Sequence, residues 1–300
     1  GVTSDPAASD AMKRIHSMRF KWLKQILKHL GLLWQALSKF NDDNGFFLSS
    51  GITFNILLNL IPFIMLLLAS VGTYLFNDRE VLDYILAYFR EVVPVLDPKI
   101  LGTLMDVIQN RTIVGALGFI GFLWLSACVF GSLRTALNIV FQVEKRRGVR
   151  RGIGIDLLMI LLTGILLLVS MILSSVVIFL QGYQGQIHAA IGPTVQWILK
   201  YLLPFLSTVV MFFLIYKIIP NESIHFKSAI QAALFTSLFW ELAKHLFTWY
   251  VTNLAGYSIV YGSLSTVVVF VLWVYYSSSI LIVGGEFAYF LEKDRQRFTV

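Results

Sequence analysis

Apolar residues in this 300-residue chain gather in six long stretches separated by short polar segments. The stretches run near 46–76, 113–141, 157–181, 195–219, 228–254 and 260–290. A helix needs about 20 mainly apolar residues to cross the hydrocarbon core of a bilayer. The pattern therefore predicts an all-α membrane protein, a six-transmembrane-helix bundle over 46–291.

Two amphipathic segments lie outside these stretches. In 19–45 apolar residues recur every three or four positions between lysines, which predicts a helix lying on the membrane surface. The loop 79–111 has the same spacing, interrupted by Pro94 and Pro98, and predicts an outer helical hairpin. The remaining ends, 1–18 and 292–300, are predicted to be a flexible N-terminal segment and a cytoplasmic tail.

The overall composition supports a membrane protein and excludes several other classes. Apolar residues make up 57% and charged residues 14%, against about 45–50% and about 25% in soluble domains. The mean hydropathy is +0.75. Too few polar residues remain to cover a water-exposed globule, so a disordered chain, a fibrous chain and an ordinary soluble enzyme are excluded.

The net charge is +7, and the basic residues behind it gather in the connections on one side of the predicted spans. Seven precede the first span and five follow the second, whereas the predicted outer connections carry few. Since basic loops stay in the cytoplasm, both termini are predicted to be cytoplasmic. The basic run at 145–151 could contact a nucleic acid, but orientation in the bilayer explains it better, and no nucleic-acid partner is expected.

The fifth span carries three ionisable residues on one helical face. Glu241 is three residues before Lys244 and four before His245. Ionisable residues at this depth are costly and often mark a substrate, ion or proton site. The alternative is a structural ion pair that offsets its own insertion cost.

Polar residues in the other spans suggest packing or gating. Asn55, Asn59 and Pro62 share a face of the first span, and Pro62 predicts a kink or a break. Arg134 and Glu286 fall at similar depths in the second and sixth spans, so a structural ion pair between them is predicted.

Signatures of catalysis and of metal binding are absent from the sequence. It contains no phosphate-binding loop, no HExxH zinc motif and no GxSxG elbow. The five histidines are scattered, and Cys128 is the single cysteine. No cofactor, no metal site and no enzymatic activity is expected.

Four segments resemble the YihY/BrkB family of bacterial inner-membrane proteins, and the resemblance covers nearly all of 20–292. They are SGITFNILLNLIPFIMLLLASVG (50–72), SLRTALNIVFQVEKRRG (132–148), PNESIHFKSAIQAALFTSLFWELAK (220–244) and YSIVYGSLSTVVVFVLWVYYSSSILIVGGEF (257–287). The resemblance implies six membrane helices and a multi-pass protein of the bacterial inner membrane. It also places Asn138, Glu241, Lys244, Tyr261, Gly262 and Glu286 on motif positions. An old family label, ribonuclease BN, is regarded as misplaced, and ribonuclease activity is not expected.

Together these features predict an inner-membrane transporter of an amphiphile, a lipid or an envelope lipid precursor, moving through a bundle-core cavity. Glu241, Lys244, His245, Asn55, Asn59 and Asn138 are the candidate substrate or ion ligands, with Pro62 as the gating kink. The expected partners are membrane lipids and envelope-assembly proteins, and the oligomeric state is left open. The alternatives are an ion- or proton-coupled carrier of a small solute, and an envelope scaffold that transports nothing.

Overall fold

Every regular element in the described part of the chain is a helix. The computed structural model describes residues 28–76, 106, 110–143, 148–182, 202–253 and 265–297. A helix at 28–42 comes first. The helices that follow are α2 (Gly45–Phe76), α5 (Arg111–Val140), α6 (Val149–Gly182), α9 (Leu203–Ile218), α10 (Phe226–Asn253) and α12 (Ser265–Arg297).

Each of the six predicted spans is helical over most of its described residues, but the count of six membrane crossings is not confirmed. Within the described residues, three helical stretches are long and apolar enough to cross a membrane: Gly45–Ser70, Arg111–Val140 and Val267–Arg297. Gly152–Leu166 and Leu203–Ile218 are shorter apolar helices. The crossings by α6, α9 and α10 therefore stay predictions.

Some boundaries differ from those predicted. Helix α6 begins at Val149 instead of near 157, and α12 continues to Arg297 through most of the predicted tail. The last turns of α12 are held by ion pairs from Asp294 to Lys28 and from Glu292 to His225. The predicted segment 1–18 lies outside the described residues, and the predicted hairpin at 79–111 lies almost wholly outside them.

A sharp turn separates the 28–42 helix from α2. Asn44 has a φ of 54°, in the left-handed region that asparagine tolerates better than most residues. The next residue, Gly45, faces the ring of Phe40, and a Cβ there would overlap it. The turn lets the amphipathic helix lie against the bundle instead of extending α2.

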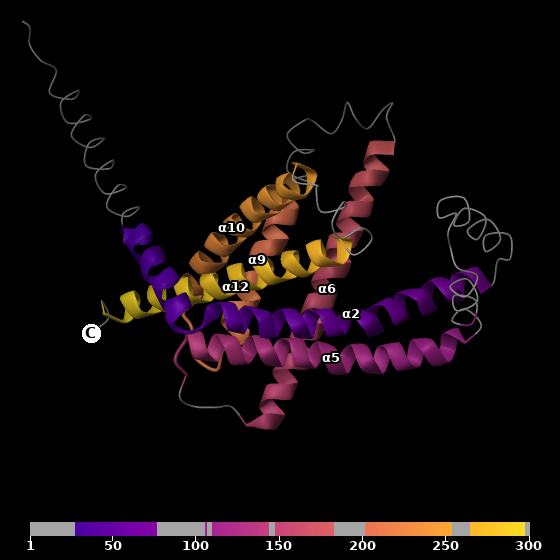
Figure 1. Cartoon of the computed structure of the whole chain (residues 1–300), viewed down its shortest axis with the longest axis horizontal. Coiled ribbons are helices and arrows are strands. Elements are labelled where there is room, and N and C mark those ends of the chain that lie inside the picture. Colours follow the sequence, from indigo (N-terminus) through magenta and orange to yellow (C-terminus); the bar gives the residue numbers. More distant parts are fainter. Residues whose placement is uncertain are drawn as a thin grey trace, which may run out of the picture.

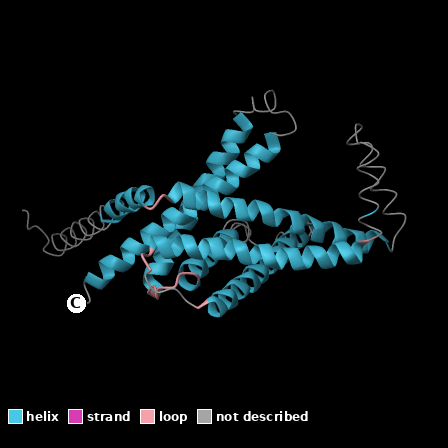
Figure 2. Cartoon of the chain, turned by 60° about the horizontal axis from the view of Figure 1, so that its bottom comes forward, coloured by secondary structure: helices cyan, strands magenta, loops and turns pink. Residues whose placement is uncertain are grey.

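Helices α2 and α5 form a close pair through a line of glycines. Gly115, Gly118 and Gly121 on α5 face the stretch of α2 around Pro62. A Cβ at Gly118 would lie 3.2 Å from the backbone nitrogen of Leu66. Small residues permit this approach between membrane helices, and the pair runs side by side in both views (Figure 1 and Figure 2).

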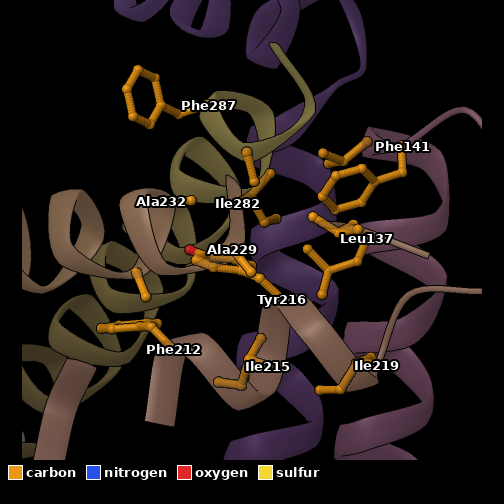
Figure 3. Close-up of a cluster of buried hydrophobic side chains, with 14 of the residues drawn as sticks. Leu137, Phe141, Phe212, Ile215, Tyr216, Ile219, Ala229, Ala232, Ile282 and Phe287 are labelled. Atoms are coloured by element: carbon orange, nitrogen blue, oxygen red, sulfur yellow. The ribbon is translucent and has the colours of Figure 1, made fainter. Parts of the chain in front are cut away.

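The hydrophobic core lies at one end of the bundle. We call this end the basic end, and it comprises the 28–42 helix, the first turns of α2 and α10, and the last turns of α5, α9 and α12. From there α9 and α10 diverge from α2 and α5, while α6 crosses the bundle (Figure 1 and Figure 2). Leu137, Tyr216, Ala232 and Ile282 are fully buried at this end, and Figure 3 shows their neighbourhood.

Candidate functional site

The predicted cluster on α10 lies at the surface of the described chain, not in its core. Lys244 Nζ lies 2.7 Å from Glu241 Oε2, and these side chains are 40% and 38% exposed. His245 is exposed. The buried face of α10 instead carries small residues: Ser228, Ala229, Ala232, Ala233, Thr236 and Ser237. The intrahelical pair exists as the sequence predicted, but the described helices do not enclose it.

The three predicted asparagines lie in different environments. Asn59 Nδ2 donates a 3.0 Å hydrogen bond to Ser126 Oγ on α5. Asn55 Nδ2 donates to the backbone oxygen of Gly51 in its own helix. Asn138 lies at the basic end, where its Oδ1 accepts from the backbone nitrogen of Asn221 at 2.9 Å. These residues do not form a single ligand-binding cluster with Glu241.

Pro62 does not break α2, which is continuous from Gly45 to Phe76. Its ring packs beside Gly121, and its carbonyl oxygen faces Gly118 on α5. The helix continues past the position where the proline removes a backbone hydrogen bond, and the glycines let α5 pack directly against it there. A broken first span is therefore not observed, and a gating role for Pro62 stays a prediction.

The predicted ion pair between Arg134 and Glu286 is wrong, because each residue has another partner. Arg134 Nη1 lies 2.8 Å from Asp156 Oδ1 on α6, and Gly152 one turn earlier leaves room for the guanidinium. Glu286 Oε2 lies 2.9 Å from Lys39 Nζ. The two pairs connect α5 to α6 and the 28–42 helix to α12.

Lys39 is the centre of a buried polar cluster that the sequence reasoning missed. Besides Glu286, its ammonium group lies 2.5 Å from Asp43 Oδ2 and donates a 2.8 Å hydrogen bond to the carbonyl oxygen of Val140. It also lies 4.7 Å from the centre of the Tyr289 ring. Glu286 is 0% exposed. The cluster therefore joins the amphipathic helix to both α5 and α12.

A signal for this cluster was present in the sequence. Lys39 follows Leu32 by seven residues and Ala36 by three, so it falls on the same helical face as these buried residues. A lysine on the apolar face of an amphipathic helix needs a partner. Lys39 also belongs to the basic residues that precede the first span, and that general role does not reveal the need for a partner.

An apolar groove lies farther along the bundle, between α10 and α12. Its volume is about 590 Å³, and its wall is aliphatic and aromatic: Ala243, Leu246, Phe247, Trp249, Tyr250, Leu272, Trp273 and Tyr276. Aromatic contacts connect it to the core, because Trp273 packs on Trp240, which in turn packs on Phe212. Pockets of about 300–1,000 Å³ with mainly apolar walls are typical of small-molecule sites.

No metal centre is found among the described residues. They contain no group of three or more histidine, cysteine, aspartate or glutamate side chains placed to hold an ion. Tyr261 and Gly262, which the family resemblance placed on motif positions, lie outside the described residues.

A family model described as "Virulence factor BrkB" matches residues 36–299 of this chain. The chain belongs to the BrkB family. Its amphipathic helix from residue 36 onward, its basic end and all six labelled helices fall inside the match.

Three relatives of this BrkB-family chain have names that say only that they are membrane proteins. A "UPF0761 membrane protein" of Pseudoalteromonas atlantica is 25% identical over 81% of this chain and 81% of its own length. One from Chromohalobacter salexigens is 28% identical over 95% of this chain and 68% of its own length. One from Haemophilus influenzae is 25% identical over 89% of this chain and 96% of its own length. No solved structure matches the chain.

The hydrogen bond between Asn59 and Ser126 gives a first prediction for this BrkB-family protein. A double-mutant cycle with Asn59→Ala and Ser126→Ala is expected to give a coupling of about 0.6 kcal/mol, the average for hydrogen bonds between membrane helices. The free energy of unfolding in detergent micelles measures it. The cycle Asn55→Ala with Ser126→Ala is the control, because Asn55 bonds within its own helix. Equal coupling in both cycles would contradict the assigned contact.

Proposed function

We propose that this membrane protein transports an amphiphilic substrate, a lipid or an envelope lipid precursor, across the bacterial inner membrane. The observation that carries the proposal is the apolar, aromatic-lined groove between α10 and α12. Its wall suits an acyl chain better than a charged solute, since few polar groups are available to replace the hydration of a charge.

The arrangement of the helices also supports transport. The core is packed at the basic end, which the excess of basic residues directs to the cytoplasm. Helices α9 and α10 diverge from α2 and α5 away from that end (Figure 1). In this proposal the basic end is the closed side of a transporter. The Glu241–Lys244 pair, on the same helix as one wall of the groove, then meets the polar headgroup.

Filling the groove tests the proposed route. Ala243→Phe adds a ring to its wall, and Leu242→Phe is the matched control, because Leu242 is 53% exposed and outside the groove lining. The added ring occupies space that an acyl chain would need, so we expect Ala243→Phe to slow lipid movement about tenfold, equivalent to about 1.4 kcal/mol. Leu242→Phe should leave the rate unchanged.

The measurement is movement of headgroup-labelled phospholipid between leaflets of proteoliposomes, read with an outer-leaflet quencher. The same measurement is made on wild-type protein, on empty vesicles and on Glu241→Gln. If wild type moves no lipid faster than empty vesicles, the proposal fails and a small-solute carrier or a scaffold becomes the better explanation. If Ala243→Phe and Leu242→Phe behave alike, the groove is not the route.

A further inference from the structure

A second cavity, polar, widely open to the surface and separate from the groove, lies at the basic end, and Asp42 and Lys293 in its wall are exposed. Its volume is about 400 Å³, and the 28–42 helix and α12 form its two main walls. The lining residues are Gln35, Ser38, Lys39, Asp42, Asp43, Gln142, Tyr289, Phe290 and Lys293. Nothing proposed above for transport uses this cavity.

The cavity offers one carboxylate and one ammonium group that the described chain does not pair. Lys39 is already shared by Asp43 and Glu286. Asp42 makes no ion pair with any other described residue, and neither does Lys293. Lys293 Nζ donates a long, 3.4 Å hydrogen bond to the Tyr289 hydroxyl and lies 5.5 Å from the centre of the Tyr289 ring, but it has no carboxylate partner among the described residues. The two unpaired charges come from opposite walls, the 28–42 helix and α12.

The charges that line the cavity balance one another. Lys39 and Lys293 supply positive charge, and Asp42 and Asp43 supply an equal negative charge. A headgroup that carries both an ammonium group and a phosphate, and so has no net charge, is therefore a better match than one that carries a phosphate alone.

Gln142 adds a hydrogen-bond donor at the end of α5. Its Oε1 accepts a 2.8 Å hydrogen bond from the Tyr289 hydroxyl, so its NH₂ group stays available for another acceptor. Its φ of 54° belongs to the left-handed cap that ends α5, where the backbone nitrogen of Val143 donates a 2.9 Å hydrogen bond to the carbonyl oxygen of Asn138.

An exposed apolar stripe beside the cavity indicates that the ligand has an acyl chain. Leu30, Trp34 and Leu37 on the 28–42 helix are 55%, 75% and 45% exposed. Trp34 lies one turn before Ser38 in the cavity wall, so the stripe and the cavity are neighbouring faces of one helix. A tryptophan on an interfacial helix lies at the level of the lipid headgroups.

We propose that this cavity binds the headgroup of a zwitterionic phospholipid with a primary ammonium group, as in phosphatidylethanolamine. The ammonium group bonds to Asp42, the phosphate to Lys293 and the Gln142 NH₂ group, and an acyl chain follows Trp34. Binding here does not require transport, so this proposal and the proposed function stand or fall separately.

The test measures which lipid stays bound. Delipidated full-length protein in detergent micelles is incubated with equal amounts of phosphatidylethanolamine and phosphatidylglycerol of identical acyl chains, and retained lipid is counted by native mass spectrometry. An exposed ion pair changes affinity by a few-fold, so wild type should retain phosphatidylethanolamine about threefold better. Asp42→Asn should abolish the preference.

Matched variants separate the cavity from general surface charge. Glu222→Gln and Lys227→Gln change exposed residues at the same end of the bundle, outside the cavity lining, and should keep the preference. Lys293→Gln should lower lipid retention about threefold. Lys293→Arg keeps the positive charge and should retain lipid as well as the wild type does. Trp34→Ala should weaken retention of both lipids. Equal retention of the two lipids by wild type overturns the proposal, and so does a preference that survives Asp42→Asn.

Discussion

Replacing Lys39 by methionine is expected to lower the free energy of unfolding by about 3–5 kcal/mol, the usual effect of removing one partner from a buried ion pair. Glu286 is 0% exposed, and Lys39 Nζ lies 2.9 Å from its Oε2. Without Lys39, the carboxylate loses a neighbouring positive charge in a place that water does not reach. An SDS titration of the purified protein in micelles, followed by far-ultraviolet circular dichroism, measures the loss.

The companion variants make this prediction specific to burial. Lys28→Met removes the same charge from the same helix, but the Lys28–Asp294 pair is exposed, so the expected loss is at most about 1 kcal/mol. Lys39→Met combined with Glu286→Met removes both members of the Lys39–Glu286 pair and should recover part of the stability, because Asp43 still lacks its partner. Equal losses for Lys39→Met and Lys28→Met would show that the buried pair does not anchor the amphipathic helix.

The second large effect is expected for Gly284→Ala. The added Cβ would overlap the Thr236 and Tyr216 side-chain oxygens and lie 3.0 Å from Thr236 Cβ. Tyr216 Oη cannot move freely, because it donates a 2.8 Å hydrogen bond to the Leu281 backbone oxygen. Forcing extra volume into a packed core costs about 1–3 kcal/mol, and displacing this hydrogen bond adds to the cost, so we expect a loss near the top of that range.

Two other glycines provide the comparison. Gly285→Ala meets the end of the Leu137 side chain at 2.9 Å, which can rotate away, so its loss should be smaller. Gly164→Ala meets nothing within 4 Å, and alanine is favoured over glycine in a helix by about 1 kcal/mol, so it should not destabilise. The same SDS titration ranks the three variants. If Gly284→Ala and Gly164→Ala are equally stable, α9, α10 and α12 do not meet as closely as described.

The elements themselves were largely predictable from the sequence. Long apolar stretches predict helices because backbone polar groups in lipid must bond within the segment, and each of the six stretches proved to contain one. The helix at 28–42 falls inside the amphipathic segment predicted at 19–45, of which 19–27 lies outside the described residues, and its end at 42 depends on the left-handed residue Asn44. The start of α6 at Val149 was missed because its first turn contains Arg150 and Arg151, which the hydropathy pattern assigned to a loop.

The pairing of polar residues was less predictable. Position along a helix can be counted at about 1.5 Å per residue, and this placed Arg134 and Glu286 at similar depths. The direction in which each side chain points around the bundle cannot be counted in this way. Asp156 and Lys39, which lie on other elements, proved to be the partners.

The sequence by itself determined that this is a helical membrane protein of the BrkB type, because hydrophobicity, periodicity and family motifs are properties of the chain alone. Only the tertiary structure decided that Lys39 is buried against Glu286, that the Glu241–Lys244 pair is exposed, and that a groove and a polar cavity lie at different levels of the bundle. The physical reason is that burial, charge pairing and cavities depend on how helices rotate and cross, and these angles are set by side-chain packing between segments far apart in the sequence.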